Sequence, residues 1–340
     1  MTFIRTSVAE GVGEIVLDRP KALNALDPSM IHDIYEPLLA WRDDPTVETV
    51  LVTSASERAF CAGGDIKAVR EAVLRRDPRF VHDFFATEYR LNRLIGEYPK
   101  PYVALIDGPA MGGGLGISVH GSVRVVTERA VLAMPETAIG FFPDVGAGYF
   151  LPRLRGAAGT YLGLTGARAS AGDALAFGLA THYVPSERLP ELADAIRAGS
   201  LVEGLDKFVE QPAEAPLADR QAQIDEVFGA GNPAQMLTRL TGTDPWTVQT
   251  RAAMLAHSPT SQFVTAELIA RGAVDSLPDC LDRELALTGP VTAAPDFAEG
   301  VRAVLVDKDR SPSWSPATLD EVDPGAIAAL FDPQAGTLDT

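Results

Sequence analysis

The order of apolar and polar positions predicts that strands and helices alternate in the N-terminal part of the chain. Residues 12–18 (VGEIVLD) alternate roughly between apolar and polar side chains, as half-buried strands do. Residues 47–54 (VETVLVTS) are almost wholly apolar at their centre, which suits a strand that is covered on both faces. Two further strands are predicted at 101–107 and 123–128.

Helical segments separate these predicted strands. Asp27 precedes Pro28 at the start of a helix that runs to about Trp41, which matches the preferences for the N-cap and the first helical position. A long helical stretch is predicted at roughly 66–96, and a short glycine-rich helix follows the third strand. Strands that alternate with helices indicate βαβ units with right-handed crossovers.

The pattern changes in the second half of the chain. A loop at 134–148 leads into helices rich in Ala, Leu and Gly, and the strand signals fade after about residue 205. We therefore predict an α/β region at 1–205, followed by a mainly helical C-terminal region at 206–340.

Charge and composition narrow the class of protein. The chain has 340 residues with 29 Lys and Arg against 46 Asp and Glu, a net charge of −17, which argues against nucleic acid or an anionic membrane as the main partner. Cys61 and Cys280 are too far apart for a zinc motif or a disulfide framework, and the histidines form no HExxH. From the spacing of the cysteines and histidines we expect no metal site. Because no signal peptide or membrane-spanning run is evident, we expect a cytoplasmic protein.

Glycines cluster directly after the third predicted strand, in PAMGGGLGIS at 109–118. The dinucleotide fingerprint and the P-loop both fail here, and no GxSxG motif is present. A strand that runs into glycines and then into a helix exposes backbone N–H groups that an oxyanion could reach, and Gly63 or Gly64 in CAGGD offers a second such donor. The alternative is that the glycines only permit tight packing of strand against helix, and spacing alone leaves both interpretations open.

Two acidic residues lie in the apolar loop MPETAIGFFPD. Glu136 and Asp144 could be the caps of a turn and of a short helix. Alternatively, the apolar lining could prepare a carboxyl group for acid–base or nucleophilic work. The residues themselves do not separate these alternatives.

Several stretches together resemble the crotonase (enoyl-CoA hydratase/isomerase) superfamily. They are AFCAGGDI, PYVALIDGPAMGGGLGIS and AMPETAIGFFPDVGAGYFLPRL. FFATEYRLN and the tail segment DFAEGVRAVLVDKDRSPSW are most similar to the 3-hydroxyisobutyryl-CoA hydrolase branch. The resemblance implies a crotonase-like (ClpP/crotonase) α/β spiral of ββα units with a helical C-terminal region, in which 1–205 is the core that carries the thioester site.

The resemblance also implies roles for particular residues. By motif position, the backbone N–H groups of Gly64 and Gly113 form an oxyanion hole for the thioester carbonyl. Glu136 corresponds to the second catalytic glutamate of the hydratases, whereas Gly116 stands where hydratases carry the first. Asp144 lies in the FPD sequence that the hydrolase branch shares.

Three weaker assignments complete the implied site. Glu88 matches an acidic position near the substrate, although it could be an ordinary glutamate on a helix surface. Lys21 and Ala22 lie in the loop RPKALNAL, which resembles the segment that runs along coenzyme A, and Lys21 and Arg19 are candidates for local positive charge there.

The implied reaction is hydrolysis of 3-hydroxyisobutyryl-CoA to 3-hydroxyisobutyrate and CoA, a step of valine catabolism. Glu136 either attacks the carbonyl or activates water, and Asp144 orients or protonates the reacting groups. Two alternatives stay open: an enoyl-CoA hydratase or isomerase of short-chain acyl-CoA, and a non-catalytic acyl-CoA-binding protein. No metal or redox cofactor is implied because CoA is part of the substrate, and the superfamily suggests a homo-oligomer, a trimer or hexamer.

Overall fold

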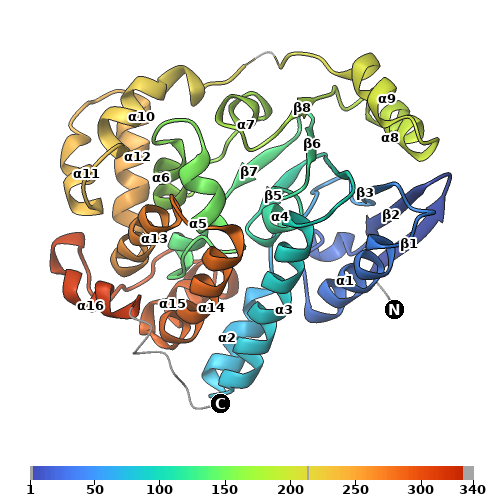
Figure 1. The fold of residues 1–340 in the computed structure, drawn as a ribbon. Coiled ribbons are helices and arrows are strands. Elements are labelled where there is room, and N and C mark those ends of the chain that lie inside the picture. Colours follow the sequence, from blue (N-terminus) through green and yellow to red (C-terminus); the bar gives the residue numbers. More distant parts are fainter. Residues whose placement is uncertain (1–2, 213, 332–340) are drawn as a thin grey trace. The chain divides into compact units, whose positions relative to one another are not determined.

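A six-stranded sheet organises the N-terminal part of the molecule, and the computed structural model describes residues 3–212 and 214–331 (Figure 1). Its strand order is β1-β2-β3-β4-β6-β8. The β1–β2 pair is antiparallel and each later pair is parallel. The strands are β1 (Ile4–Ala9), β2 (Val12–Leu17), β3 (Thr49–Ser54), β4 (Tyr102–Ile106), β6 (Val123–Val126) and β8 (His182–Tyr183).

The four strands predicted from the apolar pattern correspond to β2, β3, β4 and β6, so those predictions are confirmed. All five residues of β4 are buried, as expected for a central strand. The sequence did not reveal β1, because only Ile4 of this edge strand is buried and its other residues carry no apolar signal. The turn that joins it to β2 contains Glu10 and Gly11, both at positive φ, as tight hairpins require.

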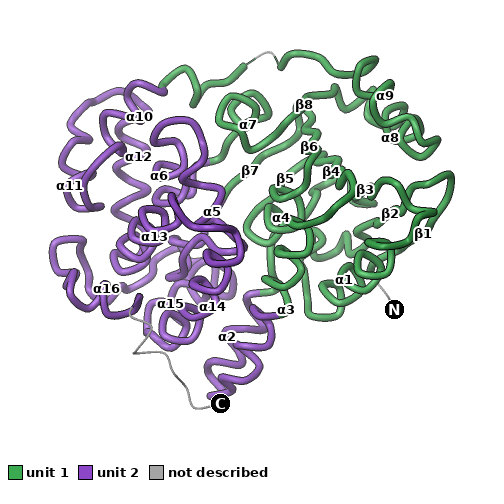
Figure 2. Tube along the Cα trace, in the orientation of Figure 1, with its two compact units in different colours: residues 1–65, 87–133, 168–220 green, residues 66–86, 134–167, 221–340 purple. Residues whose placement is uncertain are grey.

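The chain divides into two compact units that interleave along the sequence (Figure 2). The first unit comprises 1–65, 87–133 and 168–220, and the second comprises 66–86, 134–167 and 221–340. The boundary predicted at about residue 205 is not tested by this division and stays a prediction.

The first unit holds the sheet and its covering helices. One face of the sheet packs against α8 (Leu189–Arg197) and α9 (Leu201–Phe208). Leu192, Ile196 and Phe208 of these helices join strand residues such as Leu51 and Val103 in one apolar cluster. A second, two-stranded sheet pairs β5 (Pro109–Met111) with β7 (Val131–Ala133). The helices of this unit are η1 (Pro20–Ala22), α1 (Pro28–Arg42), the end of α3 (Pro78–Gly96), α4 (Gly113–Gly116), α7 (Ala171–Phe177), α8, α9 and η4 (Ala218–Arg220).

Helix α1 begins as the sequence predicts. The Asp27 side chain accepts a hydrogen bond from the Met30 amide, and Pro28 occupies the first helical position. The helical stretch predicted at roughly 66–96 is confirmed, and the chain divides it into α2 (Ile66–Leu74) and α3 (Pro78–Gly96). Pro78 disfavours helical backbone at the residue before it, and Asp77 caps the new helix by accepting from the Phe80 amide.

The regular elements described in the second unit are all helical. In addition to α2 and the start of α3, they are η2 (Glu136–Ile139), α5 (Ala147–Phe150), η3 (Leu151–Arg153), α6 (Ala158–Thr165), α10 (Gln221–Phe228), α11 (Pro233–Arg239), α12 (Pro245–Ala256), α13 (Pro259–Gly272), α14 (Leu277–Ala293), α15 (Pro295–Val301), η5 (Arg302–Val306), η6 (Leu319–Glu321) and α16 (Pro324–Leu330). The fading of strand signals after about residue 205 is therefore matched by helical structure. None of the helices within 3–212 and 214–331 is both long and apolar enough to span a bilayer.

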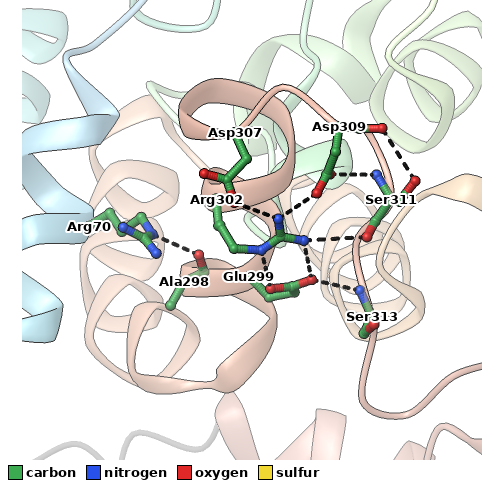
Figure 3. A network of polar contacts seen from close by, with 8 residues as sticks. All are labelled: Arg70, Ala298, Glu299, Arg302, Asp307, Asp309, Ser311 and Ser313. Atoms are coloured by element: carbon green, nitrogen blue, oxygen red, sulfur yellow. Dashed lines mark hydrogen bonds and ion pairs between the residues drawn. The ribbon is translucent and has the colours of Figure 1, made fainter.

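An ionic network fixes the segment that follows α15 (Figure 3). The Arg302 guanidinium pairs with Glu299, Asp307 and Asp309 at 2.6–2.8 Å. The Glu299 carboxylate also accepts from the Ser313 amide, and the hydrogen bond from Arg302 helps to lower the pKa of Glu299 to about 2. One arginine thus ties down the DKDRSPS segment, which the apolar pattern alone would leave as an unstructured tail.

Candidate active site

The first unit brings two glycine loops side by side. A parallel bridge joins Cys61 to Ala110 of β5, so CAGGD runs alongside the strand that leads into MGGGLG. The amide nitrogen of Gly64 lies 3.2 Å from the point where a Cβ on Gly113 would stand. The two candidate oxyanion donors predicted from the sequence therefore belong to neighbouring loops.

The backbone amides of Gly64 and Gly113 take no part in the backbone hydrogen bonds that pair the neighbouring segments. The bridge between Leu26 and Gly64 uses the amides of Leu26 and Asp65, each 2.8 Å from its acceptor. Gly113 is the first residue of α4, where an amide has no acceptor within the helix. The two N–H groups are thus of the kind that an oxyanion hole needs.

Gly113 and Gly114 have different surroundings. A Cβ on Gly114 would overlap the carbonyl oxygen of Cys61, so this glycine is required for packing. A Cβ on Gly113 would instead overlap the Glu88 carboxyl and crowd the Gly64 amide. The packing interpretation is thus confirmed at Gly114, and the role of the Gly113 amide as an oxyanion donor stays a prediction.

Glu88 is buried, and the alternative that it is an ordinary surface glutamate is wrong. It lies on α3 with only 2% of its surface exposed, and its Oε1 faces Gly113. Its charge also reaches Cys61, whose pKa is raised to about 12 chiefly by burial and further by Glu88. The Cys61 thiol therefore stays protonated and is unsuited to be a nucleophile.

The loop RPKALNAL is built around a buried asparagine. Asn24 donates to Ser54 Oγ at 2.8 Å and to the Phe60 carbonyl at 2.9 Å. The Arg19 guanidinium is committed inside the unit, to the Ala25 carbonyl and to Asp65. Lys21 is exposed and Ala22 is half-buried on η1, so of the two predicted cations Lys21 is the one directed to solvent.

The two acidic residues of MPETAIGFFPD lie in the second unit. Glu136 heads η2 with 7% of its surface exposed, and Asp144 is 6% exposed in the turn before α5. Neither residue is the N-cap of the helix beside it, because those positions are Pro135 and Gly146. The burial of both carboxyl groups is compatible with a chemical role, which stays a prediction.

A histidine that the sequence left unassigned helps to hold η2. His257 Nδ1 lies 2.9 Å from Thr137 Oγ1 and 3.2 Å from the Leu164 carbonyl. Burial lowers the pKa of His257, which favours the neutral ring. We interpret it as a support for the element that starts at Glu136.

Glu284 on α14 is a buried acid that sequence reasoning missed. It is fully buried and accepts hydrogen bonds from the amides of Gly146 and Gly148, in the turn that follows Asp144. Burial raises its pKa to about 8, and the charge of Asp144 acts in the same direction. Its place on an ordinary amphipathic helix carried no signal that it would be buried.

A cavity of about 370 Å³ lies elsewhere in the second unit, between residues of α13, α14 and α16. Neither Glu136 nor Asp144 lines it. We therefore do not assign it to the site. Among the described residues, no group of three or more His, Cys, Asp or Glu is placed to hold a metal ion.

Comparisons with known proteins extend over almost the whole chain. Residues 12–331 match a family model described as enoyl-CoA hydratase/isomerase. The mitochondrial 3-hydroxyisobutyryl-CoA hydrolase of Gallus gallus is 44% identical over 335 residues, which are 95% of this chain and 87% of that protein. The Homo sapiens protein of the same name is 41% identical over 322 residues, 91% of this chain and 83% of that protein.

Solved structures agree with this similarity. One is described as a carnitinyl-CoA dehydratase from Mycobacterium thermoresistibile and matches with a TM-score of 0.93 and 38% identity, covering 98% of this chain and 97% of its own. Another, described as an enoyl-CoA hydratase from Rhodobacter sphaeroides 2.4.1, gives the same TM-score and identity and covers 98% of both chains.

Proposed function

The chain belongs to the enoyl-CoA hydratase/isomerase family, and we propose that it hydrolyses 3-hydroxyisobutyryl-CoA to 3-hydroxyisobutyrate and coenzyme A. The observation that carries the proposal is the identity of 41–45% to curated hydrolases of that name, over 91–95% of this chain. The resemblance noted in the sequence is confirmed by the family match, and the crotonase-like α/β fold by two structures with TM-scores of 0.93. The reaction is a thioester hydrolysis, a step of valine breakdown.

We propose that the amides of Gly64 and Gly113 bind the thioester carbonyl oxygen. Negative charge develops on this oxygen when the carbonyl carbon is attacked, and preorganised N–H donors stabilise it. The adjacent glycine loops, and the two amides that take no part in the pairing of the neighbouring segments, support this role. Loss of one such donor typically lowers turnover about 10²–10³-fold.

Glu136 is proposed to cleave the C–S bond in one of two ways. Its carboxylate either attacks the carbonyl carbon and expels the CoA thiolate, leaving a mixed anhydride that water opens, or takes a proton from the water that attacks. Asp144 orients or protonates groups at the reacting centre. The burial of both carboxyl groups supports this assignment.

Glu88 is proposed to contribute to substrate binding, because its buried carboxyl adjoins Gly113. Lys21, exposed on the RPKALNAL loop, is a candidate contact for the CoA phosphates, and Ala22 lies beside it. We expect turnover without any added metal or redox cofactor. The assembly into a trimer or hexamer stays a prediction. The cytoplasmic location is also a prediction, and it differs from the names of the curated relatives, which describe mitochondrial proteins.

The second candidate function is hydration or isomerisation of a short enoyl-CoA. Two similar structures are described as a dehydratase and a hydratase, which favours keeping this alternative. Against it, Gly116 replaces the first of the two glutamates that hydration uses. Incubation with 3-hydroxyisobutyryl-CoA and a thiol reagent, and separately with crotonyl-CoA, decides between them: free thiol supports the hydrolase, and loss of enoyl absorbance supports the hydratase.

The role of Glu136 is tested with Glu136→Gln, with the exposed Glu226→Gln as a matched control. We expect thiol release to fall by a factor on the order of 10²–10⁴ in Glu136→Gln, while CoA still binds. The control should keep its rate. Near-normal thiol release in Glu136→Gln would contradict the role assigned to this residue, and tight CoA binding by an inactive wild-type protein would support a non-catalytic binding protein.

A further inference from the structure

The turn that follows Asp144 has an unfavourable backbone conformation. Val145 has φ +54° and Gly146 has φ +86°, so two consecutive residues are left-handed. This conformation is a genuine outlier for a β-branched residue such as valine, and it persists only where the surroundings enforce it. The direction of the Asp144 backbone therefore depends on whatever holds this turn.

Glu284, on α14, supplies one contact that holds this turn. Its Oε2 accepts from the Gly146 amide at 2.7 Å, and its Oε1 accepts from the Gly148 amide at 2.8 Å. One N–H on each oxygen is the pattern that suits a carboxylate. A Cβ on Gly148 would stand only 3.2 Å from Glu284 Oε1, so the turn and the carboxyl group are closely fitted.

We propose that Glu284 is a positioning residue for Asp144: by binding both amides, it fixes the left-handed turn and so sets the direction of the Asp144 carboxyl. This inference rests on the proposed function, in which Asp144 acts at the reacting centre. Burying a glutamate completely costs folding free energy unless its carboxyl group finds hydrogen-bond partners. The bidentate contact to the turn gives a reason for placing a carboxyl group there.

The charge of Glu284 should make this contact depend on pH. Burial raises its pKa to about 8, the charge of Asp144 adds to the effect, and the two amides and Arg283 oppose it. Cys280, one turn earlier on α14, is the other titratable group coupled to it. As Glu284 loses its proton, both oxygens become full acceptors and the turn is held more firmly.

The test compares the wild type with Glu284→Gln, Asp144→Asn and the double variant, with Glu226→Gln as control. Glutamine has one acceptor where two amides need one each, so we expect kcat to fall by a factor on the order of 10–10² while KM changes little. Because Glu284 acts through Asp144, the double variant should be no slower than Asp144→Asn alone.

A merely structural role would lower the melting temperature and leave the pH profile unchanged. A positioning role predicts that the kcat of the wild type rises as the pH passes through about 8, and that this step is absent from Glu284→Gln. Hydrogen exchange at the Gly146 and Gly148 amides gives a readout that needs no catalysis, and we expect it to be faster in Glu284→Gln.

The outcomes separate the inference from the proposed function. A Glu284→Gln protein with the kcat, pH profile and amide exchange of the wild type overturns the inference, even if Asp144→Asn is impaired. A wild-type rate in Asp144→Asn, or an inactive wild type, overturns the function proposed for Asp144 instead, and amide exchange still tests the contact. Should Glu284→Gln fail to fold, Glu284→Asp replaces it: its side chain is too short to reach both amides, so unchanged exchange in that variant also overturns the inference.

Discussion

Replacing Glu284 with glutamine should remove a pH dependence from the stability of the fold. The carboxyl group is fully buried, and its pKa is about 8 in the folded protein against an ordinary value of 4.5. Between these two values the unfolded chain has already released the proton that the folded protein still holds. Raising the pH therefore favours unfolding across this window, and the loss is complete above about pH 8.

The size of the effect follows from the same two values. Stability falls by about 1.4 kcal/mol for each pH unit in which only the folded protein holds the proton, or about 5 kcal/mol over the whole window. Between about pH 5 and about pH 8.5 the expected loss is roughly 4 kcal/mol. Glutamine does not titrate, so Glu284→Gln lacks this contribution, although one backbone N–H loses its acceptor at every pH.

The measurement is urea unfolding of both proteins at constant ionic strength between these two pH values. We expect the difference in the free energy of unfolding to move by roughly 4 kcal/mol in favour of the variant as the pH rises. Contributions from other buried groups, such as Asp296 and His257, are common to both proteins and cancel. The free energy of unfolding of Glu226→Gln should change with pH as that of the wild type does. If that of Glu284→Gln changes with pH in the same way, Glu284 is ionised in the folded protein and the reasoning from its burial is refuted.

Three other predictions concern different parts of the chain. Gly113→Ala should lower thiol release about 10²–10³-fold, because its Cβ crowds the Glu88 carboxyl and the Gly64 amide. The control Gly289→Ala adds a Cβ in open space on α14 and should leave kcat unchanged. Equal rates of thiol release in these two variants would contradict the oxyanion assignment. The ion pairs of Arg302 hold the segment after α15 in place (Figure 3). Arg302→Ala should therefore make this segment more susceptible to trypsin, which cleaves after Lys308 and Arg310. An unchanged digestion pattern would show that the network is dispensable. Burial raises the pKa of Cys61 to about 12 and that of Cys280 to about 11. Neither thiol should therefore react with a thiol reagent at neutral pH until urea unfolds the protein. Rapid labelling of the native protein would contradict the burial of these cysteines.

Much of the first unit followed from local pattern. The runs at 12–18 and 101–107 predicted β2 and β4 because burial of one or both faces leaves an apolar signal in the sequence. Strand β1 left no such signal, since it lies at the edge and exposes most of its side chains. The break between α2 and α3 is marked in the sequence by Asp77-Pro78, because proline disfavours helical backbone at the residue before it.

The sequence by itself determined the family, the glycine turns and the acids at 136 and 144, because these are short motifs whose residue types and spacing are visible along the chain. Only the tertiary structure decided that Gly114 serves packing while Gly113 adjoins the Gly64 amide, and that Glu88 is buried. It alone revealed Glu284, which lies 138 residues from Gly146 along the chain. Whether a helical glutamate faces water or two backbone amides depends on which distant segment packs against it, and no local pattern of residues records that choice.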